Sequence, residues 1–516
     1  MNPTSKSPVE PRDEHNRSWI EAVGPADWQP PQPKECYDLV VLGAGTAGLV
    51  TAAGAAGLGA RVALVEKHRM GGDCLNVGCV PSKSLLSSAH RVADVRRAGR
   101  YGIHGAESAH VDFTAVMERL RRIRAGIAPH DGARRFQGLG VDVFFGHARF
   151  VDDRHVDVEG RRLRFRRAVV ATGARARLPD IPGLADCGAL TNENVFNLTA
   201  LPARMVVLGG GPIGCEMAQA FARLGSKVTL VHNKAQILDR EDPEAAAVVR
   251  SSLESDGIRV LAEARVEGVS KTGDVTCLRI QGPGSSRWTL EADALLVATG
   301  RAPNVEGLGL ESVGVKWDPV RGVEVDDHLR TRNSRIYACG DVCLESKFTH
   351  VADFSARIVI QNALFALGPL GRRRVSDLVV PRVTYTDPEI AQVGLGVREI
   401  QAGKTAFDVF TVPFASVDRS ITEDETGGFA RVWVARGTDR MLGATLVGTG
   451  AGELVSELTL ALRAGLGLSA IAATIHPYPT RSEVLRKLGD QYQRTRLTPR
   501  SRSLLHALLA IGRWTG

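Results

Sequence analysis

The chain has 516 residues, with 65 Lys and Arg against 57 Asp and Glu, a formal net charge of +8. This length predicts about three domains, and the excess charge with only 5% aromatic residues does not favour a nucleic-acid partner. No run of about twenty apolar residues is visible, so we expect no transmembrane span. The first residues are polar and include Glu10, Asp13 and Glu14, unlike a signal or transit peptide, so we expect a cytoplasmic protein.

The first 42 residues contain a Pro-rich segment and then a strand. Residues 1–34 are predicted to form an extended N-terminal arm. The apolar run 38–42 predicts a buried parallel strand, which leads into Gly43-Ala44-Gly45-Thr46-Ala47-Gly48 and an alanine-rich helix.

The strand 61–65 comes next and ends at Glu66, 21 positions after Gly45. A glycine turn between strand and helix, with an acid at this distance, predicts a dinucleotide site. The pyrophosphate would rest on the helix N-terminus and Glu66 would bind the ribose 2′-OH.

The run 71–83 contains two cysteines, Cys74 and Cys79, with four residues between them. The glycine and asparagine in between let the chain fold back, so the two thiols can form a disulfide. Pro81 is predicted as the first residue of a helix, with the residue before it outside. Cys79 would then lie at a helix N-terminus, where the dipole and Lys83 stabilise a thiolate. The spacing is unlike a zinc knuckle, and we interpret the cysteines as a redox pair.

The strand–glycine–helix pattern recurs. The strand 204–208 leads into Gly209-Gly210-Gly211-Pro212-Ile213-Gly214, a helix and the strand 227–231, and the same offset lands on His232. Each unit is followed by a strand ending Val-Ala-Thr-Gly, at 170–173 and 297–300, and the segment 336–341 is predicted to end against a cofactor. We therefore expect two dinucleotide sites, one inserted into the domain of the other. The alternative is that the second glycine turn only packs a helix on a sheet.

These motifs resemble the class I pyridine nucleotide-disulfide oxidoreductases, flavoenzymes that include dihydrolipoyl dehydrogenase, glutathione reductase and mercuric reductase. The match runs from about Tyr37 to about Leu488. It implies an α/β fold with two Rossmann-like domains, the NAD(P) domain inserted in the FAD domain, plus an α+β C-terminal dimerisation domain. A homodimer that shares its active sites across the interface follows from the resemblance.

The resemblance also implies domain boundaries. We expect an arm at 1–34, an FAD-binding domain at 35–183 and 307–377, an NAD(P)-binding domain at 184–306, a dimerisation domain at 378–490 and a basic tail at 491–516.

Site residues follow by position. Cys74 would be the thiol that meets substrate and Cys79 the thiol that contacts the flavin, with Lys83 and Glu216 as an ion pair beside flavin and nicotinamide. The implied FAD ligands are Gly43, Gly45, Gly48, Glu66, Lys83, Thr172, Gly173 and Asp341, and the implied NAD(P) ligands are Gly209, Gly211, Gly214, His232, Lys234 and Gly300. No bound metal is expected.

The chain departs from the disulfide-reducing members at Tyr478. Those members carry a catalytic His here, bonded to a Glu five positions later, which this chain retains as Glu483. A His near pKa 6.5 accepts a proton at neutral pH, and a Tyr near 10 does not. Mercuric reductases also carry this tyrosine, but they use cysteines near the C-terminus, and this chain has none after Cys343. His476 could replace the base or be structural, and we favour the structural interpretation.

Two features concern partners. With His232 in place of an acid, Lys234 and His232 could meet a 2′-phosphate, which favours NADPH and leaves NADH open.

The tail 491–516 is basic, and the apolar residues of 504–511 fall largely on one helical face. It could lie on an anionic membrane or pack on the protein or across the dimer, and we prefer packing.

The expected function is an FAD-dependent NAD(P)H oxidoreductase. Electrons would pass through FAD and the Cys74/Cys79 disulfide to a metal ion, as in mercuric reductase, or to a small electrophilic or quinone acceptor. One alternative is a dihydrolipoyl dehydrogenase. Another is a flavoprotein whose main role is binding or membrane docking.

Overall fold

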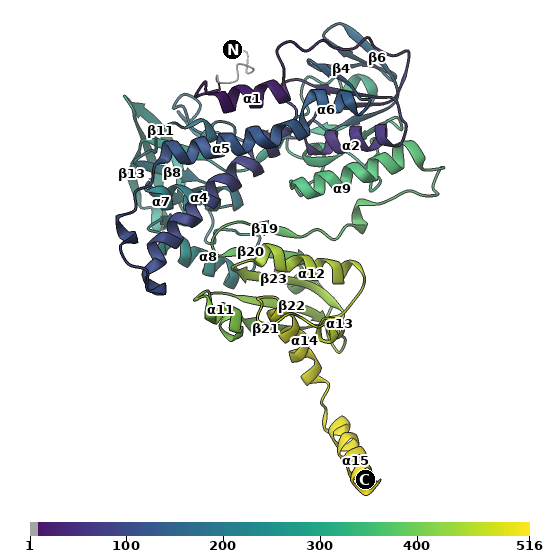
Figure 1. The fold of residues 1–516 in the computed structure, drawn as a ribbon. Helices are drawn as coiled ribbons and strands as arrows, with labels where there is room; N and C mark the ends of the chain where they lie inside the picture. Colours follow the sequence, from purple (N-terminus) through teal and green to yellow (C-terminus); the bar gives the residue numbers. More distant parts are fainter. Residues whose placement is uncertain (1–8, 404, 516) are drawn as a thin grey trace. The chain divides into compact units, whose positions relative to one another are not determined.

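The structure, a computed structural model, describes residues 9–403 and 405–515. Residues 1–8 of the predicted arm and residue 516 of the predicted tail lie outside the described residues. Figure 1 draws the fold, and the chain divides into two compact units. The first unit comprises Met1–Gly209, Ala220–Val231 and Ala264–Leu378, and the second comprises Gly210–Gln219, His232–Glu263 and Val379–Gly516.

The largest sheet of the first unit has seven strands in the order β3-β2-β1-β6-β5-β4, with β18 also paired to β6. These strands are β1 (Tyr37–Leu42), β2 (Val62–Glu66), β3 (Asp142–Phe145), β4 (Ala148–Asp152), β5 (His155–Val158), β6 (Arg161–Val170) and β18 (Ile336–Ala338). β3, β2, β1, β6 and β18 are mutually parallel, and β5 and β4 extend the sheet in antiparallel fashion. The apolar side chains of β1 are fully buried, as predicted for a parallel strand covered on both faces.

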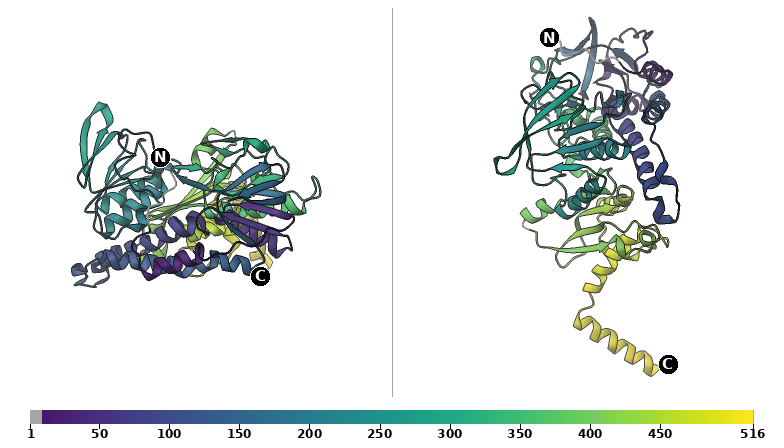
Figure 2. Two further views of the ribbon diagram at one scale, coloured as in Figure 1. Left: turned by 90° about the horizontal axis from the view of Figure 1, so that it is seen from above. Right: turned by 90° about the vertical axis from the view of Figure 1, so that its left-hand side faces the viewer.

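Helices cover this sheet and extend beyond it. α2 (Thr46–Gly57) packs against α9 (Thr349–Ile360), and α4 (Cys79–Arg97) runs beside α5 (Phe113–Ile127), as Figures 1 and 2 show. Small residues in α2 permit close packing, since a Cβ at Gly54 would lie 2.7 Å from Ile360 Cδ1. Two shorter helices are α3 (Gly72–Val77) and α6 (Ala133–Gly138).

The predicted extended arm contains a helix, so the expectation of an extended segment is wrong for residues 14–23. α1 (Glu14–Val23) starts at Asp13, whose carboxylate accepts the Asn16 N–H at 2.8 Å and caps the helix. Trp19 and Val23, four residues apart and therefore on one face, are buried in the same core as β1 and α2. Burial of that face stabilises the helix despite the polar composition of the segment.

A second parallel sheet in the first unit contains β8 (Arg204–Leu208), β9 (Lys227–Val231) and β14 (Ala294–Val297), in the order β9-β8-β14. The first two strands match their predicted ranges. Smaller sheets pair β7 (Ala174–Ala176) with β15 (Arg301–Pro303), β16 (Trp317–Asp318) with β17 (Gly322–Val323), and β11 (Arg265–Thr272) with β12 (Val275–Gln281) and β13 (Arg287–Ala292). α7 (Pro212–Leu224) follows β8 as predicted, and β10 (Arg259–Leu261) and α8 (Pro243–Ser255) belong to the second unit.

The second unit is built on a five-stranded antiparallel sheet in the order β19-β20-β23-β22-β21. Its strands are β19 (Arg382–Thr384), β20 (Glu389–Gly394), β21 (Phe407–Pro413), β22 (Phe429–Ala435) and β23 (Met441–Gly448), and its helices are α10 (Val397–Ala402), α11 (Asp418–Thr422), α12 (Ala451–Arg463), α13 (Leu468–Ala473), α14 (Glu483–Thr495) and α15 (Pro499–Thr515). Apolar residues of the sheet and of α12 and α14 form one buried core. Within residues 9–403 and 405–515, no helix combines the length and the apolar character that crossing a bilayer requires.

Candidate active site

The first glycine turn follows β1 at the carboxyl edge of the large sheet. Gly43 has φ +103°, and a Cβ there would lie 2.4 Å from the Ala171 carbonyl oxygen, while a Cβ at Gly48 would lie 1.8 Å from the Gly43 carbonyl oxygen. Only glycine fits either position. The backbone is therefore drawn tightly from β1 into α2, as a dinucleotide turn requires.

The N-terminus of α2 suits a phosphate. Its N-cap is Gly45, which provides no side-chain cap, and its first turn contains no acid, so the helix N–H groups are left for a ligand. Glu66 at the end of β2 is buried, and its carboxylate accepts the Ala44 and His68 N–H groups, each at 2.8 Å. These residues fit FAD, because its diphosphate would lie at the N-terminus of α2 and its ribose would lie at Glu66.

Two further strands end at the same edge. Thr172 and Gly173 follow β6, and Asn304 fixes them by donating its Nδ2 to the Thr172 carbonyl at 2.9 Å and accepting the Thr172 hydroxyl at its own carbonyl at 2.6 Å. Asn304 was missed in the sequence. Its signal is its place four residues after Gly300, where the second Val-Ala-Thr-Gly ends.

Asp341 lies just beyond β18 in a half-buried charge cluster. Burial raises the pKa of its carboxyl, against the opposing effects of Arg301 and Lys347. Arg301 donates to the Asp73 carboxylate and to the Ala174 carbonyl at 2.9 Å, and it lies 3.6 Å from Asp341. Burial lowers the pKa of Arg301, but Asp73 and Asp341 outweigh it and raise the pKa overall. Arg301, paired with Asp73, thus places a positive charge directly beside the predicted redox and FAD residues. Neither Asp73 nor Arg301 was predicted from the sequence.

The two cysteines lie at the ends of consecutive short elements. Cys74 is in α3, Cys79 begins α4, and Gly78 breaks the helix between them. The thiols are within hydrogen-bonding reach of one another, and Cys79 Sγ lies 3.2 Å from Thr349 Oγ1. The hydrogen bond to Cys79, burial and the negative charge of Cys79 raise the pKa of the Cys74 thiol. No disulfide joins the two thiols in the described residues.

The predicted start of the second helix needs correction. α4 begins at Cys79 rather than at Pro81, and Val80 is helical. Proline is tolerated there because the first helical N–H groups have no partner within the helix. The Ser82 N–H donates to the Gly78 carbonyl at 3.0 Å, which closes the first turn around the proline. Cys79 still lies at a helix N-terminus, as predicted.

α1 supports the redox helix α3. Trp19 Nε1 donates to Asn76 Oδ1 at 2.8 Å, and Asn76 Nδ2 donates to the Met70 carbonyl at 3.0 Å. The Arg124 guanidinium lies 3.7 Å from the Trp19 ring centroid and donates to the Asn76 carbonyl at 3.0 Å. Burial, followed by the nearby Arg69 and Arg121, lowers the pKa of Arg124 to about 10. The segment predicted as an arm therefore anchors the helix that carries Cys74.

Lys83 and Glu216 belong to different units. Lys83 lies in α4 of the first unit, and Glu216 lies in the part of α7 that belongs to the second unit. Glu216 is buried, and one of its carboxylate oxygens accepts the Tyr385 N–H at 2.9 Å. Their ion pair beside the cofactors stays a prediction.

The second glycine turn follows β8. A Cβ at Gly209 would lie 2.5 Å from the Ala298 carbonyl oxygen, whereas a Cβ at Gly211 would meet no atom within 4 Å. The open side at Gly211 is where a coenzyme backbone can approach. Gly214 lies in α7, and Gly300, with φ +137°, accepts the Arg177 N–H at 3.0 Å.

His232 does not fit the role of a cation expected for it. It is buried, and its Nδ1 accepts the Gly210 N–H at 3.1 Å, so the ring holds the glycine turn. Burial lowers the pKa of His232, which keeps the ring neutral at pH 7. Lys234 forms an ion pair with Asp239. Of the two residues expected at a 2′-phosphate, only Lys234 provides positive charge.

Tyr478 in the second unit is 71% exposed, and its hydroxyl donates to Asp418 Oδ2 at 2.8 Å. The hydrogen bond and charge of Asp418 raise the pKa of Tyr478, so the phenol keeps its proton. Glu483 Oε1 accepts from Arg486 Nη2 at 2.9 Å. Within the described part of the chain, Glu483 Oε2 is buried without a hydrogen-bond partner.

The His476 ring is fixed by two polar contacts within its own unit, as expected for a structural residue. Its Nδ1 lies 3.0 Å from the Thr474 carbonyl oxygen and its Nε2 lies 3.0 Å from Glu457 Oε1. Both ring nitrogens contact oxygen atoms of the second unit, so the ring is held in place by its own subunit. This geometry favours the structural interpretation over a replacement base.

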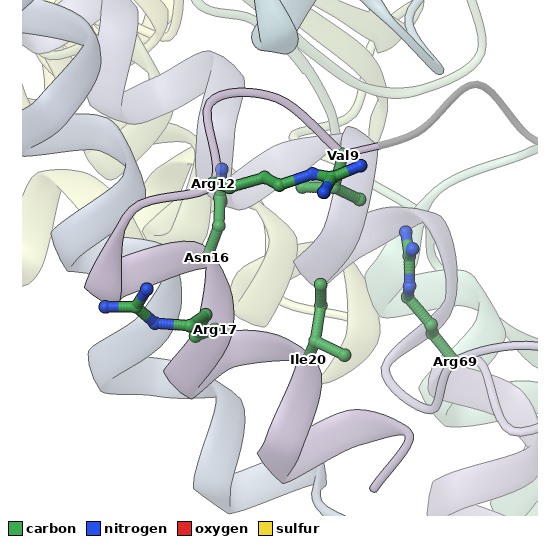
Figure 3. A pocket seen from close by; sticks show the side chains of 6 residues that line it. All are labelled: Val9, Arg12, Asn16, Arg17, Ile20 and Arg69. Carbon is green, nitrogen blue, oxygen red and sulfur yellow. The ribbon is translucent and has the colours of Figure 1, made fainter. Parts of the chain in front are cut away.

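A pocket of about 390 Å³ lies beside α1 (Figure 3). Its lining residues are Val9, Arg12, Asn16, Arg17, Ile20 and Arg69. None of them is among the predicted site residues. Asn16 Oδ1 already accepts from Arg124 at 2.7 Å, so this lining group is used within the protein.

Two family models match the chain. Residues 37–356 match the pyridine nucleotide-disulphide oxidoreductase family, and residues 380–488 match the dimerisation domain of that family. The chain therefore belongs to the pyridine nucleotide-disulphide oxidoreductases, a family of flavoenzymes that use FAD and a pyridine nucleotide and carry a redox-active disulfide. Its dimerisation domain implies a homodimer.

Individual relatives differ in the reaction their names state. A mercuric reductase from Staphylococcus aureus is 34% identical over 452 residues, 87% of this chain and 81% of that protein. A dihydrolipoyl dehydrogenase from the same organism is 33% identical over 464 residues, 88% of this chain and 96% of that protein. The HOCl-induced flavoprotein disulfide reductase RclA from Escherichia coli has a similar structure, with TM-score 0.77 and 29% identity over 88% of this chain and 99% of that chain. Its Cu(II) complex matches with TM-score 0.77 and 29% identity over 87% and 98%.

Proposed function

We propose that this reductase passes two electrons from NADPH, through FAD and the Cys74–Cys79 pair, to a small acceptor. The acceptor is a metal ion or an electrophilic or quinone-like molecule, and not a thiol disulfide such as lipoamide. The observation that carries this choice is the hydrogen bond from Tyr478 to Asp418.

FAD, when bound, accepts a hydride from the nicotinamide coenzyme and delivers two electrons to the disulfide. The S–S bond then breaks, and one proton taken up leaves a thiol on Cys74 and a thiolate on Cys79. The raised pKa of Cys74 favours this distribution. When two electrons pass to an acceptor, the S–S bond re-forms and one proton is released.

Thiol–disulfide exchange needs a base to take the proton from the attacking thiol. Tyr478 cannot act as a base at neutral pH, because its hydroxyl donates a hydrogen bond to Asp418 and this interaction raises the pKa of Tyr478. Glu483, which orients the catalytic His in disulfide-reducing relatives, bonds Arg486 instead. A metal ion or electrophile takes electrons from the thiols without this base, so such acceptors suit the site better.

An acceptor panel tests this choice. Steady-state turnover of the FAD-loaded protein would be compared for Hg(II), Cu(II), menadione, lipoamide and oxidised glutathione. We expect a metal ion or menadione to exceed both disulfides in kcat/KM. Lipoamide turnover at least as efficient as that of every other acceptor would contradict the proposal.

The second candidate is a dihydrolipoyl dehydrogenase. The similarity to the Staphylococcus aureus enzyme, which spans 96% of that protein, favours it. The same panel decides between the two, since only this candidate expects lipoamide to be preferred.

For the coenzyme we propose NADPH over NADH, with Lys234 as the cation for the 2′-phosphate. The absence of an acid at position 232 supports this preference. Asp239 competes for Lys234, so the preference should be modest. We propose further that Tyr478 of one subunit faces Cys74 of the other, as the resemblance implies.

A further inference from the structure

The last helix, α15 (Pro499–Thr515), exposes large apolar side chains along one side. They are Leu504 at 63%, Leu505 at 47%, Leu508 at 56%, Leu509 at 59% and Ile511 at 60% exposed. At 3.6 residues per turn these five positions fall within an arc of roughly 160°. Trp514, at 93% exposed, lies roughly 60° outside that arc, beyond Ile511. A set of apolar side chains this large and this exposed indicates a surface that is covered by something else.

The charges around this apolar face all have one sign. The segment 491–516 contains five arginines, Arg494, Arg496, Arg500, Arg502 and Arg513, and no Asp or Glu. Arg502, Arg513 and His506 project from the side of the helix opposite Leu504 and Ile511. The helix therefore combines an apolar face with an unbalanced positive charge.

The exposure of this face departs from the packing preferred from the sequence, and we propose instead that α15 binds the surface of an anionic lipid bilayer. It lies in the plane of the interface, with its apolar face at the boundary between headgroups and acyl chains and its arginines beside the lipid phosphates. Trp514 adds an aromatic ring of the kind that favours this interface. Positive charge selects this occupant, because a second copy of the segment would bring five arginines against five like charges.

The proposal goes beyond electron transfer and does not depend on the identity of the acceptor. None of the described helices combines the length and the apolar character of a membrane span, and α15 itself contains three arginines, Arg500, Arg502 and Arg513, so the proposed association is peripheral and reversible. The reductase would then operate at the membrane surface.

Flotation of the full-length, FAD-loaded protein with vesicles tests the proposal. We expect it to float with vesicles of phosphatidylglycerol and phosphatidylcholine, and to remain unbound with phosphatidylcholine alone. High salt should release it, because charge contributes to binding. Arg500→Ser with Arg502→Ser should weaken vesicle binding by about fivefold per arginine.

A second variant tests the contribution of the apolar face to vesicle binding. Leu504→Glu with Leu508→Glu should abolish flotation, while Ser503→Ala on the same helix should leave it unchanged. FAD content and reductase turnover without vesicles should match the native protein in all three variants, which excludes a folding defect. Failure to bind phosphatidylglycerol vesicles, or binding that survives the Leu504→Glu and Leu508→Glu changes, would overturn the proposal. Dissociation of the dimer by these changes, with no vesicle binding by the native protein, would instead assign the face to a contact between subunits.

Discussion

At the scale of single residues, the pairing of two predicted site residues, Tyr478 and Glu483, bears on the proposed choice of acceptor. Tyr478 donates to Asp418, and Glu483 Oε2 is buried without a partner in the described part of the chain. A phenol bonded to a carboxylate is a poor base, and a buried carboxylate oxygen without a donor is costly. An imidazole at position 478 would provide a base near neutral pH.

Tyr478→His should therefore raise lipoamide turnover. General-base help is typically worth about 10²–10⁴-fold, and the gain should fall in that range. The rate should rise with pH through about 6.5 or slightly above, since a His acts as a base only when neutral. A pH series of kcat/KM for lipoamide measures this. Unchanged turnover at every pH would show that proton transfer at this position is not limiting, and Tyr478→Phe is the control without a base.

The coenzyme prediction also concerns single residues. Lys234 is paired with Asp239, so Asp239→Asn should free the ammonium group and increase the preference for NADPH. Lys234→Ala should remove that preference, and His232→Gln should not, because His232 is neutral and holds the glycine turn. The ratio of kcat/KM for NADPH and NADH measures all three. A Lys234→Ala protein with its preference intact would exclude this loop as the discriminating element.

At the scale of elements, α1 and α3 form one supporting structure. The indole of Trp19 bonds Asn76 and stacks with Arg124, so the N-terminal helix fixes the helix that carries Cys74. Trp19→Phe keeps most of the ring contact and removes only the donor. We expect a loss of about 1 kcal/mol in the free energy of unfolding, measured by denaturant titration of the FAD-loaded protein. Trp28→Phe, which removes a different indole bond to the Val143 carbonyl, is the matched control for reactivity of the cysteines. Faster thiol labelling of Cys74 only in Trp19→Phe would support the anchor, and equal labelling in both would contradict it.

The contrast between α1 and β1 shows what the sequence could and could not reveal. β1, β2, β8 and β9 were predictable because continuous apolar runs and glycine turns are local signals. α1 was not, because its helix depends on burial of Trp19 and Val23 against distant residues. Likewise Cys74 and Cys79 are visible in one short motif, whereas Arg301 reaches Asp73 across 228 positions. Tyr478 and Asp418 lie 60 positions apart, and no short pattern encodes their pairing.

At the scale of the whole molecule, the homodimer carries a testable prediction about shared sites. Hybrid dimers would pair a native subunit with a subunit bearing both Cys74→Ser and Tyr478→His. If the sites are shared, the new His faces the native Cys74, and lipoamide turnover appears at about half the value of the Tyr478→His homodimer. If each site lies within one subunit, the hybrid should show no gain. Differently tagged subunits purified in tandem provide the hybrid, and the Tyr478→His homodimer provides the reference rate.

We propose above all that Cys79 meets the flavin and that Cys74 meets the acceptor. Anaerobic reduction of the FAD-loaded protein by two electrons tests it most directly, by absorbance at long wavelength. The native protein should gain a charge-transfer band from the Cys79 thiolate, Cys74→Ser should show that band before reduction, and Cys79→Ser should lack it while retaining FAD. Cys74→Ser should also lose turnover with the preferred acceptor. Full turnover by Cys74→Ser, or a band that persists in Cys79→Ser, would contradict the account.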